Sequence, residues 1–419
     1  MYLRNSTYPL LAIGLCMGGP CLAQSDPYYV GVSQAFLHQS NIFRVDESRL
    51  LADGSSRSDT VSVSSLVGGF DQTVGRQRLT GSVSLNSNRY SSNDKLNNQG
   101  YGINLGADWS TVNNISGTAK LGSRRSLKQF SNQRPDTTIT TERNIETTTD
   151  AEVVARLGVV TRYTAEVGLS HMRRDLSEAS SARLNFHENA LSLGVRYQPS
   201  NLLRLGVSAK VTHGQYPQYF VDAAGNFSAD AFKRMSIDLT GEWRPTGESK
   251  LEVRLAPSRT RYDKATVRDF TGVVGEVSWV WKPTGKLRLE STVLRDNGDR
   301  FTFDRPDAGS TLAEESRVST LLRLQASLDV TSKVQLSSAL SWAHRQLAEE
   351  TPIAGGGTSL KEGSDNLTGV RLAAKWQPTR SIELGCRIEA ERRSTNTDPT
   401  LRRGMTNNTF GCTGQFVIQ

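Results

Sequence analysis

The sequence predicts an all-β protein, an antiparallel transmembrane β-barrel of about 18 strands with short periplasmic turns and longer outer loops. Apolar and polar residues alternate along most of the chain, which is the period of a strand with one face in water. Short and long connections alternate between these segments, as in outer-membrane barrels. The mean hydropathy of −0.44 fits this class, because half of each barrel strand faces an aqueous lumen.

One strand-turn-strand unit shows the pattern most clearly. Trp279 and Trp281 share an apolar face before a Pro-Thr-Gly turn, and Leu287 and Leu289 share an apolar face after it. Similar units recur at intervals of about 38 to 48 residues, with one copy degenerate. A soluble β-propeller is the alternative, since its blades repeat at roughly 40 to 45 residues, but a blade needs four strands per period and only two are found.

An aromatic residue precedes the turn on the apolar face of each unit. Membrane barrels place such residues in a girdle at the membrane interface. The predicted girdle consists of Trp109, Tyr197, Trp243, Trp281 and Trp376.

The first 23 residues have the layout of a secretory signal peptide. Arg4 precedes an apolar run from Pro9 to Met17, and small residues end at Ala23. The run is too short for a transmembrane helix, which needs ~20 apolar residues. We therefore expect residues 1–23 to be a signal peptide and residues 24–419 to form the barrel, located in the bacterial outer membrane.

Alternation and turn residues together place the individual strands. The predicted strands are 27–39, 58–72, 77–91, 98–111, 115–128, 142–157, 161–173, 186–198, 201–213, 231–244, 248–262, 267–281, 285–297, 314–330, 332–346, 362–376, 380–393 and 405–418. Their even number is expected for a single-chain bacterial barrel. The long connections include 40–57, 214–230 and 347–361.

Charged residues occupy the strand phase opposite to the apolar one, so we expect them to line the lumen. The candidate arginines are Arg196, Arg204, Arg254, Arg288, Arg323, Arg371 and Arg387. Arginine-lined walls attract anionic solutes. Glutamates are interleaved with these arginines, so a lining of cross-strand Arg–Glu pairs that only keeps the interior wet is the alternative.

The mature chain contains two cysteines, Cys386 and Cys412. An even number of cysteines in an oxidising compartment favours a disulfide. A symmetric hairpin that joins them would turn at Pro399, and both lie in the apolar phase of their strands. We therefore expect a cross-strand bridge in the last hairpin, with two buried thiols as the alternative.

Motifs that carry chemistry are missing from the sequence. The five histidines, His38, His171, His187, His213 and His344, are isolated, and the chain has no HExxH, CxxC, GxSxG or P-loop motif. We expect no cofactor, no metal and no enzymatic activity. A barrel hydrolase assembled from several strands beside His171 or His187 is the enzyme-class alternative. The pI of about 9.3 does not indicate nucleic acid, because the charges are spread strand by strand.

Short segments spread over nearly the whole mature chain resemble the EpsL-type outer-membrane proteins of exosortase-linked exopolysaccharide operons. The matching segments are Tyr28–Ser33, His38–Arg44, Gly75–Arg78, Asn88–Tyr90, Leu96–Tyr101, Glu142–Glu146 and Asn407–Cys412. The resemblance implies a role in exopolysaccharide export or biosynthesis. It implies extracellular polysaccharide, outer-membrane lipid and periplasmic polysaccharide-export components as partners, and it carries over no site residues.

The function predicted from these observations is a passive, channel-like barrel that takes part in exopolysaccharide export or biosynthesis. A general porin is the alternative within the channel class. A plugged barrel that tethers surface polysaccharide is the binding-class alternative, because the loop Pro352–Gly357 is flexible enough to fold inward.

Overall fold

The computed structural model describes residues 27–48, 51, 54–112, 114–130, 141–158, 162–221, 226–297, 316–352, 358–396 and 404–418. The predicted signal peptide, the glycines of the predicted plug loop and the predicted hairpin turn at Pro399 lie outside these residues.

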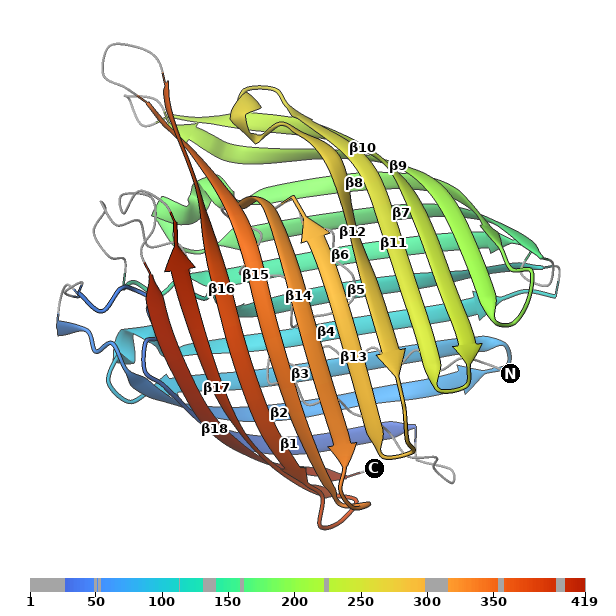
Figure 1. Cartoon of the computed structure of the whole chain (residues 1–419), viewed down its shortest axis with the longest axis horizontal. Helices are drawn as coiled ribbons and strands as arrows, with labels where there is room; N and C mark the ends of the chain where they lie inside the picture. Colours follow the sequence, from blue (N-terminus) through green and yellow to red (C-terminus); the bar gives the residue numbers. More distant parts are fainter. Residues whose placement is uncertain are drawn as a thin grey trace.

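Eighteen antiparallel strands form one closed sheet, which confirms the predicted fold class (Figure 1). The strands are β1 (Tyr28–Gln39), β2 (Asp59–Val74), β3 (Gln77–Tyr90), β4 (Asn98–Ser110), β5 (Ile115–Leu127), β6 (Ile145–Leu157), β7 (Tyr163–Leu176), β8 (Phe186–Tyr197), β9 (Leu203–Val221), β10 (Phe227–Thr246), β11 (Ser249–Tyr262), β12 (Phe270–Trp281), β13 (Leu287–Asp296), β14 (Ser316–Asp329), β15 (Val334–Pro352), β16 (Thr358–Trp376), β17 (Ile382–Thr395) and β18 (Met405–Ile418). Within the described connections lie the short 3₁₀ helices η2 (Asp94–Leu96), η3 (Ala179–Leu184) and η4 (Thr266–Arg268).

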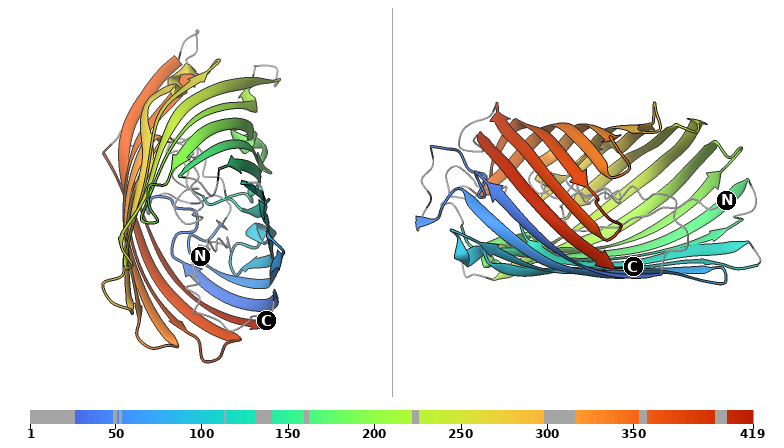
Figure 2. Two further views of the ribbon diagram at one scale, coloured as in Figure 1. Left: turned by 90° about the vertical axis from the view of Figure 1, so that its right-hand side faces the viewer. Right: turned by 90° about the horizontal axis from the view of Figure 1, so that it is seen from below.

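The first and last strands close the barrel. β1 pairs with β2 on one side and with β18 on the other, in a register that runs from Val30 opposite Ile418 to Gln39 opposite Thr409. Each strand therefore has two neighbours, and no row of backbone donors and acceptors is left open at an edge. The wall is elongated in cross-section, as the left view of Figure 2 shows.

The β12–β13 hairpin follows the predicted pattern. Trp281 pairs with Leu289 on the outward phase, while Val280 pairs with Glu290 on the inward phase. The alternation holds because lipid contacts one face of the wall and water the other. We call the end of the barrel that carries this turn the turn end, and the opposite end, with the longer connections, the loop end.

Large apolar side chains are exposed on the outer face instead of being buried in a core. Leu193 of β8, Ile237 of β10, Leu169 of β7 and Phe36 of β1 are each more than half exposed. Among the described residues no helix is long and apolar enough to cross a membrane. A closed barrel with an apolar outer belt is the architecture of a bacterial outer-membrane protein.

Two predicted long connections are shorter in the structure than the sequence suggested. β9 continues to Val221 and β10 begins at Phe227, and β15 continues to Pro352 and β16 begins at Thr358. The predicted connections 214–230 and 347–361 are therefore wrong in their boundaries. The strands here extend beyond the apolar belt, where neither face needs apolar residues, so the alternation that marks a strand fades while the backbone pairing continues.

Candidate functional site: the lumen and its loop-end mouth

The inward phase of the strands carries all seven candidate arginines. On β8, for example, Leu193, Val195 and Tyr197 face outward and Arg196 lies between them on the opposite phase. The same reading places Arg204, Arg254, Arg288, Arg323, Arg371 and Arg387 toward the lumen. These residues come from six further strands, so together they lie along much of the inner wall.

Carboxylates neutralise most of these arginines. The pairs, with the distance between a guanidinium nitrogen and a carboxylate oxygen, are Arg196–Glu166 at 2.9 Å, Arg204–Glu242 at 3.1 Å, Arg254–Asp238 at 3.0 Å, Arg288–Glu290 at 3.1 Å and Arg371–Glu389 at 3.1 Å. The lining is thus of mixed sign. This arrangement supports the Arg–Glu alternative over a wall of free positive charge.

Some carboxylates serve more than one cation. Glu242 of β10 lies 3.1 Å from Arg204, 2.6 Å from Arg244 and 4.0 Å from Lys250. Because Arg204 comes from β9 and Lys250 from β11, the carboxylate ties β9, β10 and β11 together on the inner wall. Removing its charge would leave three cations with less compensation.

A second sector of the inner wall is neutral. We call the inward side chains of β18 and β1–β4 the neutral arc. In the middle of these strands it presents hydroxyl and amide groups, among them Ser33, Ser65, Ser82, Ser84, Asn86, Asn104, Thr413 and Gln415. On β1 and β2 these groups alternate with the buried apolar side chains of Ala35, Val63 and Val67. The lumen therefore combines a charge-paired sector with a neutral sector that is polar and partly apolar.

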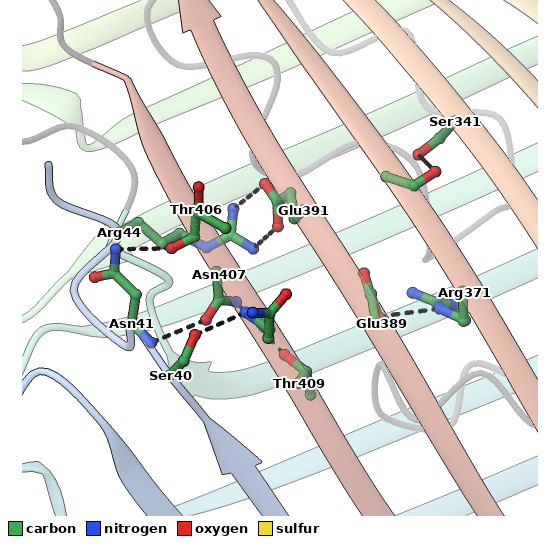
Figure 3. A network of polar contacts seen from close by, with 12 residues as sticks. Ser40, Asn41, Arg44, Ser341, Arg371, Glu389, Glu391, Thr406, Asn407 and Thr409 are labelled. Carbon is green, nitrogen blue, oxygen red and sulfur yellow. Dashed lines mark hydrogen bonds and ion pairs between the residues drawn. The ribbon is translucent and has the colours of Figure 1, made fainter. Parts of the chain in front are cut away.

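The connection after β1 contacts strands from the other end of the sequence. We call residues 40–48 the entrance segment. Arg44 donates two hydrogen bonds to Glu391 of β17, one of 2.8 Å, and the Asn41 backbone N–H donates to Asn407 Oδ1 of β18 at 3.0 Å (Figure 3). The Asn41 side chain also donates to the carbonyl of Thr406 at 3.0 Å. These bonds fix the segment at the loop end of the β17–β18 wall.

Apolar contacts hold the other side of the entrance segment. Ile42, Phe43 and Val45 are buried against Leu96, with Tyr90 packed beside them. Arg44 adopts a left-handed backbone conformation, with φ of 54°. This conformation lets the Arg44 side chain reach Glu391 while the Phe43 side chain packs against Leu96. The segment thus connects β17 and β18 with the loop end of β3. The sequence prediction missed it, because its partners are far apart along the chain.

Ionic groups are also buried on the inward phase beside this contact. Arg345 of β15 donates from Nε to Asp365 of β16 at 2.7 Å, and Arg393 of β17 lies 3.9 Å from the same carboxyl group. All three side chains are at most 5% exposed. A buried charge persists only when it is paired, so this cluster fixes the arrangement of β15–β17 at the mouth.

The predicted girdle residues lie on the outward phase at the turn end. Trp109, Tyr197, Trp243, Trp281 and Trp376 each stand near the end of an even-numbered strand. Tyr197 stacks on Tyr163 with ring centroids 4.8 Å apart, and Trp281 stacks on Trp279 at 5.8 Å. An outward aromatic row at this level is where barrels contact lipid headgroups.

Cys386 of β17 and Cys412 of β18 stand directly opposite each other and form a disulfide. Cys386 shares the exposed outward phase with Leu384 and Ile388. The bridge therefore lies on the lipid-facing side of the last hairpin, away from the lumen.

The five histidines also lie on the outward phase, near the loop end. Three of them contact a polar side chain on the next strand: His38 Nδ1 and Thr60 at 3.0 Å, His171 Nδ1 and Asn189 at 2.8 Å, and His344 Nδ1 and Asn366 at 3.0 Å. The part of the chain that the structure describes contains no group of three or more His, Cys, Asp or Glu residues that could hold a metal ion.

Comparisons with known proteins give similarity at the level of architecture. No protein-family model matches the chain, and no curated protein matches it. Among solved structures, OccK9 (OpdG) of Pseudomonas aeruginosa is 11% identical, with a TM-score of 0.49 over 93% of this chain and 98% of that one. OccK5 (OpdH) of Pseudomonas aeruginosa is 11% identical, with a TM-score of 0.48 over 94% and 98%. The siderophore receptor PirA of Acinetobacter baumannii is 6% identical, with a TM-score of 0.45 over 95% and 81%. At this level the likeness assigns no function to the chain.

Proposed function

We propose that the barrel is a passive conduit of the outer membrane that takes part in the export of an exopolysaccharide. The observation that carries the proposal is the character of the inner wall. Most of its candidate arginines are paired with carboxylates, and its neutral arc presents hydroxyl and amide groups. Such a wall is hydrophilic without a strong net field.

A polysaccharide chain is rich in hydroxyl groups, which exchange hydrogen bonds with serine, threonine and asparagine side chains. Conduction requires binding that is favourable enough for entry and weak enough for release. Single hydroxyl and amide contacts meet this condition, because the net free energy of each hydrogen bond is only about 1 kcal/mol. The resemblance to EpsL-type proteins supports a polysaccharide as the solute.

A general porin is the nearest alternative, because a hydrophilic wall also passes small solutes. A tethering barrel is the second alternative, and the entrance segment favours it. Its bonds from Asn41 and Arg44 to β17 and β18 hold a loop across part of the mouth. In a tethering barrel the mouth would hold polysaccharide without passing it.

Liposome swelling separates these three functions. Vesicles with the refolded protein would be placed in isosmotic solutions of neutral oligosaccharides of increasing length and of uronic-acid oligosaccharides of matched length. A conduit predicts swelling that continues for oligosaccharides and differs little between neutral and anionic sugars. Swelling with monosaccharides alone would favour the general porin. Absence of swelling from a barrel with normal heat-modifiable mobility would contradict a conduit and favour tethering.

A further inference from the structure

A groove crosses the outer face of the barrel from the turn end of β17 to the loop end of β5. We call it the outer groove, and its volume is about 1020 Å³. One wall follows a single hydrogen-bonded row of outward side chains: Phe416, Val32, Leu66, Leu85, Tyr101 and Arg125. The row rises toward the loop end from strand to strand, so the groove crosses the apolar belt obliquely.

Small residues form the other wall of the outer groove. Gly414, Ser64 and Ser87 occupy outward positions two residues along their strands from Phe416, Leu66 and Leu85. Ser64 donates a hydrogen bond of 2.7 Å to Gln34, so these polar groups are paired within the wall. The outer groove therefore has one apolar wall and one flat wall of small residues. An extended acyl chain fits this shape, because it can bury apolar surface against the apolar wall.

An arginine pocket continues the outer groove at the loop end. Its volume is about 450 Å³, and Arg89, Arg125 and Arg143 line it. The two cavities share Ser87, Gln99 and Arg125, so they form one continuous depression. Arg143 donates a hydrogen bond of 2.9 Å to the carbonyl of Asn97, which holds its guanidinium at the pocket. Neither cavity has an Asp or Glu among its described lining residues.

The charge of the outer face is strongly one-sided. Across β1–β13 the outward phase carries Arg89, Arg125, Arg173, Lys233, Arg259, Arg261 and Arg295, all in the loop-end half. Among the described residues of that phase Asp175 is the one acid, and it pairs with Arg173 at 2.7 Å. The inner wall, by contrast, pairs most of its candidate arginines with carboxylates. Arg261 pairs with Asp269 of the next connection at 3.1 Å. The outer cations beside the outer groove, Arg89 and Arg125, are placed to meet an external anion at the level of the outer leaflet.

The apolar belt of the outer face ends abruptly in the loop-end half of the barrel. One hydrogen-bonded row across β7–β11 consists of His171, Asn189, His213, Lys233 and Arg261. The next outward row toward the turn end contains Leu169, Leu191, Val211 and Met235 on β7–β10 and ends at Arg259 of β11. On β7–β10 the step from apolar to polar and cationic side chains over two residues marks the boundary between acyl chains and headgroups.

We propose that the outer groove and the arginine pocket bind one phosphorylated glycolipid of the outer leaflet, with an acyl chain in the groove and a phosphate held by Arg89, Arg125 and Arg143. Guanidinium groups match phosphate oxygens in charge and in bidentate geometry. A second copy of this chain fits the pocket poorly, because it would have to supply several acidic side chains, and the described outward phase of the strands offers only Asp175 and Glu362. The assignment does not depend on what passes through the lumen.

The test is native mass spectrometry of the detergent-purified barrel titrated with bisphosphorylated lipid A. The same lipid stripped of phosphate and phosphatidylglycerol are the comparison probes. The key variant is Arg89→Gln/Arg125→Gln/Arg143→Gln. Its matched control, Lys233→Gln/Arg259→Gln/Arg295→Gln, removes the same number of outward cations elsewhere on the wall. Heat-modifiable mobility on gels verifies that each barrel is folded.

We expect one bound lipid A per wild-type barrel, with an affinity about tenfold weaker in the key variant and nearly unchanged in the control. Loss of the lipid phosphates should weaken binding about as much. The variant Ser64→Leu/Ser87→Leu, which fills the groove and keeps the arginines, should also weaken it. Equal losses in the key variant and the control, equally tight binding of phosphatidylglycerol, or a lipid-free dimer joined through this face would each overturn the proposal.

Discussion

The guanidinium of Arg44 and the carboxylate of Glu391 form a doubly hydrogen-bonded ion pair across 347 residues of sequence. The two side chains are only 10% and 9% exposed. Arg44 follows the first strand and Glu391 lies on the seventeenth, and the closure of β1 on β18 brings them together. The pair therefore joins the barrel closure to the position of the entrance segment at the mouth.

Substitution Glu391→Gln should destabilise the barrel and loosen the entrance segment. Breaking a buried ion pair leaves the other charge uncompensated, and the expected loss in the free energy of unfolding is about 3 kcal/mol. The measurement is urea unfolding of the barrel in lipid vesicles. Glu252→Gln is the control, since its pair with Lys250 is 43% and 31% exposed and should contribute less than about 1 kcal/mol. Equal effects of both substitutions would contradict the structural role of Glu391.

The charge-paired lumen predicts a shift in ion selectivity when one carboxylate is neutralised. In Glu242→Gln the cations Arg204, Arg244 and Lys250 lose a shared partner, so the local field becomes positive. The ratio of anion to cation permeability, measured from reversal potentials, should rise by about twofold. Asp175→Asn removes the same charge from the outer face and should leave the ratio unchanged. A shift in that control, or none in Glu242→Gln, would contradict the inward placement of this cluster.

The disulfide should stabilise the last hairpin without affecting the lumen. Cys386 and Cys412 are 26 residues apart, and closing a loop of this length contributes about 3 kcal/mol. Cys386→Ser/Cys412→Ser should unfold at lower urea concentration than the oxidised wild type and at the same concentration as the reduced wild type. Its channel conductance should equal that of the wild type, since the bridge faces lipid. A changed conductance would contradict the outward position of the bridge.

The stacked side chains of Trp279 and Trp281 should stabilise the folded barrel at the turn end, and their contributions to the free energy of unfolding should be coupled. Their parallel rings are 5.8 Å apart, and aromatic pairs contribute about 1 kcal/mol beyond their buried area. A double-mutant cycle with Trp279→Ala and Trp281→Ala, followed by urea unfolding in vesicles, measures this coupling. A coupling energy indistinguishable from zero would show that the two rings act independently at the interface.

Period-two alternation made the strands predictable. Lipid contacts the outer face of the wall and water contacts the inner face. Around Trp281 and Glu290 apolar and polar residues therefore alternate, and this alternation shows which face each residue occupies. The same reading placed the candidate arginines on the inward phase. It could not choose between free arginines and Arg–Glu pairs. That choice depends on which strands are neighbours in register, as for Arg204 of β9 and Glu242 of β10.

The sequence reading missed features that depend on contacts between distant segments. Nothing near Arg44 in the sequence indicates Glu391, and the buried cluster of Phe43 with Leu96 lies in a segment without periodicity. The outer groove was missed for another reason. Gln34 and Ser64 occupy outward positions where a strand in lipid is expected to be apolar, so the alternation there is weak. Only the pairing of β1 with β2 shows that these residues lie together.

Single-channel conductance of the refolded barrel in a planar bilayer shows whether the lumen is hydrophilic, has paired charges and conducts polysaccharide. We expect discrete open currents, a reversal potential near zero in a salt gradient, and concentration-dependent block by neutral and anionic oligosaccharides alike. Strong anion selectivity, with block by anionic sugars alone, would contradict the paired lining. No current from a folded barrel would contradict the conduit itself.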